Sequence, residues 1–318
     1  MSWILQNYLP AGEIVRDLIF LGCLIIVCLV PQFANGVFDR IEKFGSNLSS
    51  RKLQCISLLA IGTIIIRLSL LWLIPIPYPQ IHDEFSYLLG GDTFAHGRLT
   101  NPPHPMSLYL DTIHVNQHPT YQSKYPPAQA AVLALGQVIG NPWFGVLLST
   151  AVMCGAVLWM LQGWFPPRWA LLGGTLVLLR LGIFSYWMNS YWGGSVAAIG
   201  GALVVGALPR LLRHWRVLDS LILGSGVVIL VNSRPFEGFF LCLPVFVVLV
   251  AKLCGTRRPS MKVALSRVVL ILQLAGDGQR QPRTLHGERK SLFQHPIVRM
   301  AISQAQTSLC QSAIRQVL

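Results

Sequence analysis

The chain has 318 residues, of which 53% are hydrophobic and only 12% charged, and its mean hydropathy is +0.54. Soluble domains usually carry about 25% charged residues, so this composition excludes an ordinary soluble domain and predicts a polytopic membrane protein. The formal net charge is +13. Because the basic residues cluster in short loops, we attribute this charge to loops that face anionic lipid, and we expect no nucleic-acid binding.

Apolar runs recur along the chain, and a helix that crosses a bilayer needs about 20 mostly apolar residues. We predict about seven spans, at residues 14–33, 53–74, 143–161, 169–188, 192–209, 217–233 and 236–253. A shorter apolar stretch at 127–140 follows Pro126-Pro127 and is expected to lie in the interface or to re-enter the membrane. A further stretch stops near Ala275 and predicts a partial eighth span. The expected fold is all-α, a transmembrane helical bundle.

Basic residues mark every second loop between these predicted spans. They lie within Arg40–Lys52, at Arg168, within Arg210–Arg216 and within Lys252–Lys262. By the positive-inside rule these loops are cytoplasmic. The large loop 75–126 is then extracytoplasmic, as are the short connectors around Ser190 and Asn232. We expect a multi-pass protein of a bacterial inner (plasma) membrane.

The predicted organisation has three parts. Residues 1–52 form an additional span and a cytoplasmic loop, and residues 53–275 form the main membrane domain, which includes the loop 75–126. Residues 276–318 are polar and rich in glutamine, and we expect them to be disordered. A span that stops short before a tail of foreign composition predicts a C-terminal truncation or a shifted reading frame.

The loop 75–126 concentrates the titratable groups of the chain, since it holds four of the 12 acidic residues and five of the eight histidines. Its first acids are Asp83 and Glu84, which follow the proline-rich exit Pro75–Pro79. Adjacent side chains point about 100° apart on a helix and to opposite faces on a strand. We therefore predict Asp83 as a general base and Glu84 as its support or as a substrate ligand. The alternative is that both are solvated loop acids.

Several basic residues are candidate ligands for an anion. Lys124 precedes a proline pair and is either an interfacial anchor or a phosphate ligand. Arg67 and Arg180 lie inside predicted spans, where a charge costs about 2.5–3.5 kcal/mol at the helix centre and so has a partner or a purpose. Arg234 lies at an outer connector, where it either pairs with Glu237 or binds an anion.

Aromatic and histidine residues give two further indications. The connector Tyr186–Gly194 is rich in Tyr and Trp, which is typical of an interfacial belt and also suits stacking against a sugar or a prenyl chain. The spacing of the loop histidines matches no metal-ligand motif, and none of the seven cysteines lies in the loop. We therefore expect no cofactor; a divalent metal is an open alternative that no motif supports.

Together, His82-Asp83-Glu84-Phe85-Ser86-Tyr87 in the first large outer loop and Lys124-Tyr125-Pro126-Pro127 before the next membrane segments resemble the GT-C glycosyltransferases. These are polytopic enzymes of the protein O-mannosyltransferase and aminoarabinose-transferase kind. The resemblance covers about residues 55–250. It implies transfer of a sugar from a polyprenyl-phosphate carrier to a glycan, lipid or protein acceptor outside the cytoplasm. Unlike most members, this chain has its Asp-Glu pair after the second predicted span.

The residues fit that chemistry. A lipid-linked phosphate is a good leaving group whose charge needs cations, the incoming hydroxyl needs a base, and one displacement without a covalent intermediate inverts the anomeric centre. The predicted catalytic residues are Asp83 and Glu84, the predicted donor-phosphate ligands are Lys124, Arg180 and Arg234, and the predicted substrate contacts are His82, Tyr87, Tyr125, Asn189, Tyr191 and Glu237. The alternatives are a multi-pass transporter or flippase, and a non-catalytic fragment of a glycosyltransferase.

Overall fold

A computed structural model describes residues 21–22, 43, 45–107 and 112–254. Most of the predicted first span, the partial eighth span and the polar tail 276–318 lie outside these residues. The chain divides into two compact units, residues 1–50 and 51–318. In the first, residues 45–50 are helical, and the Ser49 hydroxyl donates a hydrogen bond to the Ser46 carbonyl. The second unit holds the elements described below.

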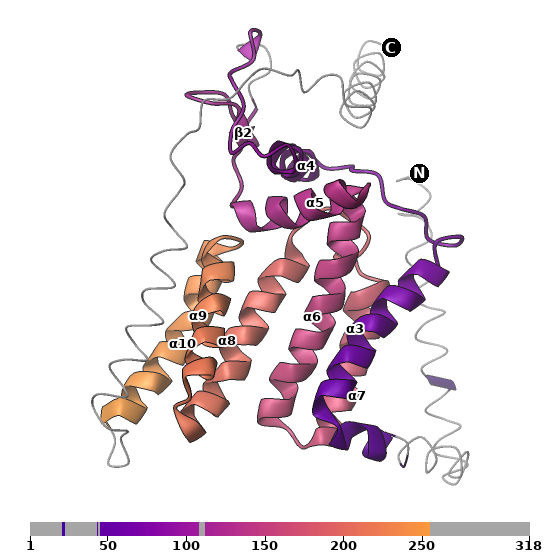
Figure 1. Cartoon of the computed structure of the whole chain (residues 1–318), viewed down its shortest axis with the longest axis vertical. Helices are drawn as coiled ribbons and strands as arrows, with labels where there is room; N and C mark the ends of the chain where they lie inside the picture. Colours follow the sequence, from indigo (N-terminus) through magenta and orange to yellow (C-terminus); the bar gives the residue numbers. More distant parts are fainter. Residues whose placement is uncertain (1–20, 23–42, 44, 108–111, 255–318) are drawn as a thin grey trace. The chain divides into compact units, whose positions relative to one another are not determined.

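Four helices in the described part of the chain are long and apolar enough to cross a membrane. They are α3 (Lys52–Ser69), α6 (Pro142–Trp164), α8 (Gly194–His214) and α10 (Pro235–Cys254). Two shorter elements pack among them. One is α7 (Pro167–Val177), which continues as the π-helical segment η2 (Leu178–Ile183), and the other is α9 (Val217–Val231). These helices run side by side as a bundle (Figure 1).

The outer helices of the bundle carry large apolar side chains that are exposed along their length. On α3 these include Leu53, Leu58, Ile61 and Ile65, and on α10 they include Phe236, Phe239, Phe240, Leu243 and Phe246. Side chains of this kind are stable at a surface that lipid covers, whereas water would disfavour so large an apolar area. Together with the four long apolar helices, they indicate a membrane protein.

The predicted spans are confirmed in part. The four long helices coincide with the predicted spans 53–74, 143–161, 192–209 and 236–253. The predicted spans 169–188 and 217–233 are shorter as helices, because α7 has 11 residues before the π-helical segment and α9 has 15. A bundle of seven full-length spans is therefore not confirmed. The short stretch predicted at 127–140 is α5 (Pro127–Ile139), a helix of 13 residues.

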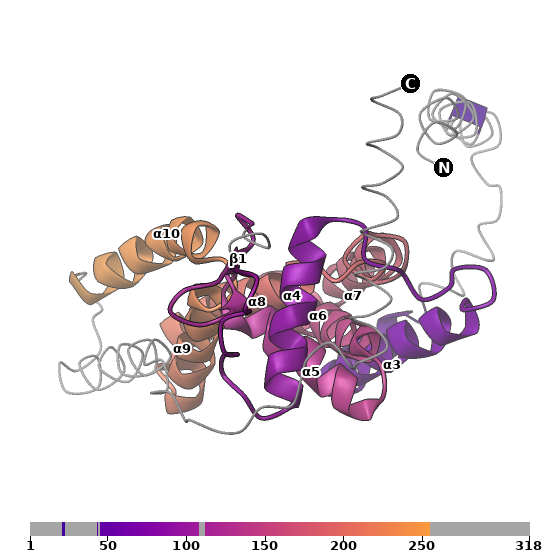
Figure 2. The same cartoon turned by 90° about the horizontal axis from the view of Figure 1, so that it is seen from above.

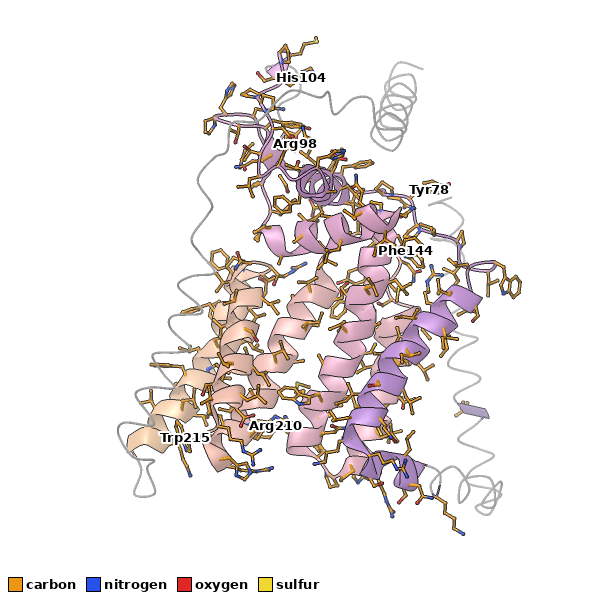
Figure 3. All side chains as sticks on the ribbon, in the orientation of Figure 1. Tyr78, Arg98, His104, Phe144, Arg210 and Trp215 are labelled. Carbon is orange, nitrogen blue, oxygen red and sulfur yellow. The ribbon has the colours of Figure 1, made fainter. Side chains whose placement is uncertain are left out.

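Basic residues collect at one end of the bundle, where α8 ends beside the end of α6. The Arg210 guanidinium donates to the Trp159 carbonyl at 2.8 Å and lies over the Trp159 ring, 4.0 Å from its centre. Arg213 reaches the Gly163 carbonyl at 3.4 Å. Figure 3 shows Arg210 and Trp215 at this end, and Arg98 and His104 at the opposite one. Two arginines of the predicted basic loop Arg210–Arg216 thus lie against backbone carbonyls of α6.

The opposite end is capped by two helices that lie across the bundle. They are α4 (His82–Ala95) and α5, and Figure 2 shows α4 lying over the helix ends. Gly90 and Gly91 permit a close crossing: a Cβ atom at Gly90 would lie 2.8 Å from the Ala130 Cβ, and one at Gly91 would lie 2.9 Å from the Leu133 Cβ. The segment predicted as an outer loop is therefore partly helical, and it packs tightly on α5.

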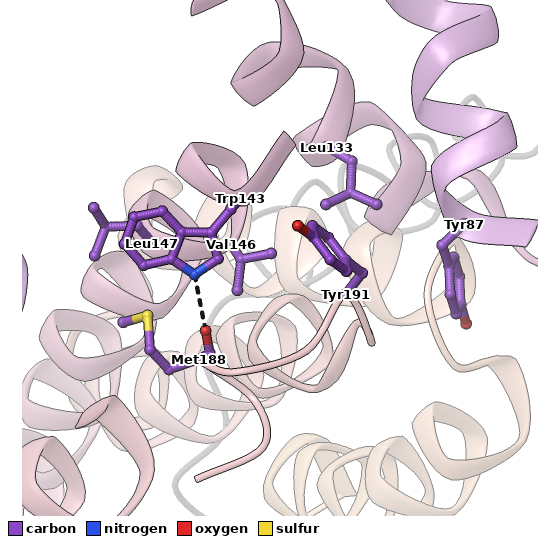
Figure 4. Packing of buried hydrophobic residues seen from close by; sticks show 7 residues of the cluster. All are labelled: Tyr87, Leu133, Trp143, Val146, Leu147, Met188 and Tyr191. Atoms are coloured by element: carbon purple, nitrogen blue, oxygen red, sulfur yellow. Dashed lines mark hydrogen bonds between the residues drawn. The ribbon is translucent and has the colours of Figure 1, made fainter. Parts of the chain in front are cut away.

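A small hairpin completes the cap. Strand β1 (Val115–Asn116) pairs antiparallel with β2 (Gln122–Ser123), so that Val115 lies opposite Ser123. Beneath it, a core cluster joins α4, α5, α6 and the connector between η2 and α8 (Figure 4). Its largest member is Trp143, which is fully buried and donates its indole N–H to the Met188 carbonyl at 3.1 Å. Through Tyr87, this cluster packs α4 against α5, α6 and the connector.

Candidate functional site

Asp83 lies in the first turn of α4, and two side chains bind one of its carboxylate oxygens. The Tyr125 hydroxyl donates a hydrogen bond to Asp83 Oδ1 at 2.6 Å. His114 Nδ1 lies 2.9 Å from the same oxygen and 2.9 Å from the Tyr125 hydroxyl. Among the described residues, Asp83 Oδ2 has no hydrogen-bond partner. The Asp83 side chain is 26% exposed and that of His114 is 22% exposed, so the cluster is accessible from outside the fold.

The hairpin explains why residues distant in sequence meet here. Its register, continued by one residue, places His114 opposite Lys124, and the Lys124 N–H donates to the His114 carbonyl at 3.3 Å. That carbonyl also accepts the Ser86 hydroxyl of α4 at 2.6 Å. The Ser86 and Ser123 hydroxyls are 2.8 Å apart. The hairpin therefore delivers His114, Lys124 and Tyr125 together to the start of α4.

Two pairs of stacked rings flank the cluster. The rings of His82 and His114 stack with their centres 5.5 Å apart, and those of Tyr87 and Tyr125 stack at 4.8 Å. Burial, and then the hydrogen bond and charge of Asp83, raise the pKa of Tyr125 far above its usual value. Tyr125 is therefore a neutral phenol at physiological pH and acts as a hydrogen-bond donor to Asp83.

Glu84 has a different environment from its neighbour, since its side chain is buried and only 3% of the residue is exposed. One oxygen accepts the backbone N–H groups of Gln80 and Ile81, at 2.8 and 3.2 Å. The other accepts the Tyr191 N–H at 2.9 Å. These hydrogen bonds favour a supporting role for Glu84 over a role as a substrate ligand. The carboxylate also stabilises the start of α4, because it lies near the positive end of the helix dipole.

Arg67 also contacts the connector between η2 and α8, at Asn189, whereas Glu84 contacts it at Tyr191. It is fully buried, and its guanidinium donates to the Ile74 carbonyl at 2.8 Å and to the Asn189 side-chain oxygen at 3.0 Å. It also lies over the Trp143 ring, 4.9 Å from its centre. The Asn189 amide donates in turn to the carbonyls of Ile183 and Ser185. The predicted partner of this intramembrane charge is thus a set of neutral oxygens and an aromatic ring.

Tyr191, predicted as a substrate contact, is buried beneath the cap. Its hydroxyl donates to the Pro77 carbonyl at 3.0 Å, and its carbonyl accepts the Gln129 side-chain amide at 2.9 Å. Burial, with a contribution from the charge of Glu84, raises the pKa of Tyr191 to about 12. The polar groups of Tyr191 and Asn189 therefore hold the connector in place.

The three predicted phosphate ligands lie on different segments of the fold. Lys124 is exposed and lies next to Tyr125. Arg234 lies on the connector between α9 and α10, where it pairs with Glu237 at 3.0 Å, as one of the two predictions for it required. A hydrogen bond of 2.9 Å from the Ala128 N–H to the Asn232 carbonyl ties this connector to the start of α5.

Arg180 is exposed on the π-helical segment. In the part of the chain that the structure describes, no hydrogen bond or ion pair joins it to the cluster around Asp83.

Sequence reasoning did not single out His114, which contacts Asp83 directly. Its only signal was membership of the histidine-rich loop, because a hairpin without a Gly turn gives no clear pattern. Among the described residues, no group of three or more His, Cys, Asp or Glu side chains is arranged to hold a metal ion. The cluster that the structure brings together is Asp83, His114, Tyr125, His82 and Tyr87.

Comparison of the chain with protein-family models, with curated proteins and with solved structures finds no match. The arguments for a function therefore rest on the residues of the site and on their geometry.

Proposed function

We propose that this chain is a membrane glycosyltransferase of the GT-C type, which transfers a sugar from a polyprenyl-phosphate carrier to an acceptor hydroxyl outside the cytoplasm. The observation that carries the proposal is the environment of Asp83. Its carboxylate is partly exposed, one oxygen is fixed by Tyr125 and His114, and it lies at the capped end of an apolar helical bundle. A base at such a place can reach an acceptor in water and a donor whose chain lies in lipid.

The reaction is a single displacement. Asp83 takes the proton of the acceptor hydroxyl, and the acceptor oxygen forms a bond to the anomeric carbon of the sugar. The bond between that carbon and the phosphate oxygen breaks, and the electron pair leaves with the polyprenyl phosphate. Lys124, adjacent to Tyr125, stabilises the departing negative charge, and Arg234 is a second cation for this role if it leaves Glu237. Configuration at the anomeric carbon is inverted.

The arginines at one end of the bundle support the proposed orientation. The end with Arg210 and Arg213 faces the cytoplasm, and the cap with α4 and α5 faces outward. In this arrangement α7 with η2, and α9, also cross the membrane beside the four long helices, and α5 lies at the interface. The rings of Tyr186 and Trp192, whose centres are 5.7 Å apart, belong to the connector at the capped end, where a sugar or a prenyl chain can stack.

A transporter is the rival class. Transporters place polar groups and broken helices near the membrane midplane. Arg67, a fully buried charge on the candidate span α3, donates hydrogen bonds to two backbone carbonyls and to Asn189, and these contacts support a role in holding the fold.

The test of the proposal is sugar transfer by the purified protein in lipid, with a panel of polyprenyl-phosphate sugars. Asp83→Asn keeps the shape of the side chain but removes the base, and should lower kcat by about 100-fold or more. Asp219→Asn, the same change at the basic end of the bundle, is the control and should leave the rate per folded molecule unchanged. Full activity of Asp83→Asn would show that Asp83 is not the base.

Donor binding tests the cation separately from the base. Lys124→Ala should weaken binding of a polyprenyl phosphate by about 10-fold, since one charge-assisted contact is lost. Lys52→Ala, an exposed lysine at the start of α3, is the matched control. Asp83→Asn should keep its donor affinity. Unchanged binding in Lys124→Ala would remove Lys124 from the site, and no binding by any form would favour the transporter.

A further inference from the structure

The displacement described above needs only Asp83 as a base and does not use His114. Three polar atoms nevertheless meet at short range: Asp83 Oδ1, the Tyr125 hydroxyl oxygen and His114 Nδ1, with separations of 2.6, 2.9 and 2.9 Å. An ionised carboxylate offers no hydrogen, and a phenol offers one. Two hydrogens are needed to bridge the three contacts without opposing lone pairs. The second hydrogen must therefore come from His114 Nδ1.

This requirement selects a particular form of the imidazole ring. With Nδ1 protonated, His114 and Tyr125 both donate toward the same side of the Asp83 carboxylate. Oδ1 is then occupied by two donors, whereas Oδ2 has no partner in the described parts of the chain. A carboxylate oxygen that accepts two hydrogen bonds has little lone-pair density left for a further proton, so the unoccupied oxygen is the basic one.

We propose that His114 is a positioning residue for the base: its Nδ1–H, together with the Tyr125 hydroxyl, binds Oδ1 of Asp83 and so presents Oδ2 to the acceptor hydroxyl. This inference rests on the proposed function and deepens it. It assigns a role to a residue outside the motifs that resemble the GT-C family, and it names which oxygen takes the proton.

The surroundings of His114 keep the ring in this orientation. Its backbone carbonyl is bound by Ser86 and by the Lys124 N–H, which fixes the start of the side chain. One ring face stacks on His82, and the ring of Tyr125 is tilted against it with a centre-to-centre distance of 6.3 Å. The charged and titratable groups that face the ring are thus Asp83, His82 and Tyr125, with Lys124 across the hairpin.

Two substitutions separate the hydrogen bond from the bulk of the ring. The side-chain amide of Asn can place an N–H group close to the position of His Nδ1, whereas Ala has no donor. We expect His114→Ala to lower kcat by about 10- to 100-fold, the loss typical of one hydrogen bond to a charged group. We expect His114→Asn to retain kcat within about 5-fold of the wild type. The KM for the donor should stay the same in both, because the phosphate cations are untouched.

His118 supplies the matched control, because it is an exposed histidine at the tip of the same hairpin. His118→Ala and His118→Asn should both behave like the wild type. If His114→Asn loses as much activity as His114→Ala while both remain folded, the donor has no role and the proposal is wrong. If His114→Ala raises the donor KM without lowering kcat, His114 belongs to donor binding and the proposal is equally wrong.

A second measurement does not depend on activity. The ¹⁵N spectrum of protein labelled at the histidine ring nitrogens, assigned with His114→Asn, reports which nitrogen carries hydrogen. We expect Nδ1 of His114 to be protonated in the wild type, and its signal to shift in Asp83→Ala. A His114 ring protonated only at Nε2 would overturn the inference. If the protein transfers no sugar from any donor, the proposed function fails, and the nitrogen spectrum still decides the His114 contact by itself.

Discussion

At the scale of single residues, Asp83 and Glu84 show how one helical turn separates two adjacent acids. Asp83 is partly exposed and meets side chains, whereas Glu84 is buried and meets three backbone N–H groups. The sequence predicted such a division because adjacent side chains point in different directions both on a helix and on a strand. It could not predict the contact of His114 with Asp83, because that contact depends on the register of a hairpin, and the sequence has no turn motif that indicates this hairpin.

The buried acid should matter for stability more than its exposed counterpart. Glu84→Gln replaces one acceptor oxygen by an amide that faces backbone N–H groups, and should lower the free energy of unfolding in detergent by about 1.5–3 kcal/mol. Glu237→Gln is the matched control, since the Glu237 side chain is 62% exposed in a surface pair and should change stability by less than about 1 kcal/mol. Thermal unfolding of the two variants compares the two losses of stability. Equal effects would mean that the contacts of Glu84 with the backbone contribute little.

At the scale of elements, the length of an apolar run determined which helices could be predicted from the sequence. The long apolar helices α3, α6, α8 and α10 were predictable, because an uninterrupted apolar run of that length is a strong signal. Helix α4 was not recognised, since it buries Ser86, Asp92 and Thr93 along with its apolar residues. Its polar and apolar positions therefore show no clean helical period, and only packing on α5 reveals it as a helix.

The crossing of α4 and α5 gives a test of that packing. Gly91→Ala would place a Cβ atom 2.9 Å from the Leu133 Cβ, an atom bonded directly to the backbone that no change of rotamer can move. The crossing must then open, at a cost of about 1–3 kcal/mol in stability. Gly62→Ala is the control, because the nearest atom to the new Cβ on α3 is 4.0 Å away. That change should be neutral or stabilising by up to about 1 kcal/mol. A neutral Gly91→Ala would contradict the close crossing.

Gly91→Ala should also change the geometry of the cluster around Asp83. Because α4 carries Asp83, a shift of the helix moves the carboxylate relative to Tyr125, which belongs to the segment that leads into α5. We therefore expect Gly91→Ala to lower transfer activity beyond the loss of folded protein, and Gly62→Ala to leave it intact. The activity per folded molecule of the two variants, measured side by side, would separate a displaced site from a merely less stable one.

At the scale of the whole membrane unit, the two ends of the bundle differ in charge and in architecture. One end gathers arginines at the close of α8, and the other carries the cap and the titratable cluster. The alternation of basic loops in the sequence predicts that the end of the bundle with these arginines is cytoplasmic. The cap itself was not predictable, because it is held by contacts between segments that are far apart in the chain.

The orientation of these ends can be measured in intact cells with a thiol reagent that does not cross membranes. Met106→Cys, at an exposed position in the cap segment, should react from outside. His214→Cys, exposed at the end of α8, should react only after the cells are permeabilised. The unsubstituted chain gives the background from its own cysteines. The reverse pattern would place the cluster around Asp83 in the cytoplasm and exclude an extracytoplasmic donor site.

The hydrogen bond between Glu84 and the Tyr191 N–H can form only after both segments have been synthesised. The two residues are 107 positions apart, and a ribosome releases Glu84 long before Tyr191. Until the later segment emerges, one oxygen of the carboxylate has its partners Gln80 and Ile81, and the other lacks the Tyr191 N–H group. The capped end of the bundle is thus completed only after this connector has been made, and a nascent chain interrupted before it would lack one of the three backbone N–H groups that bind Glu84.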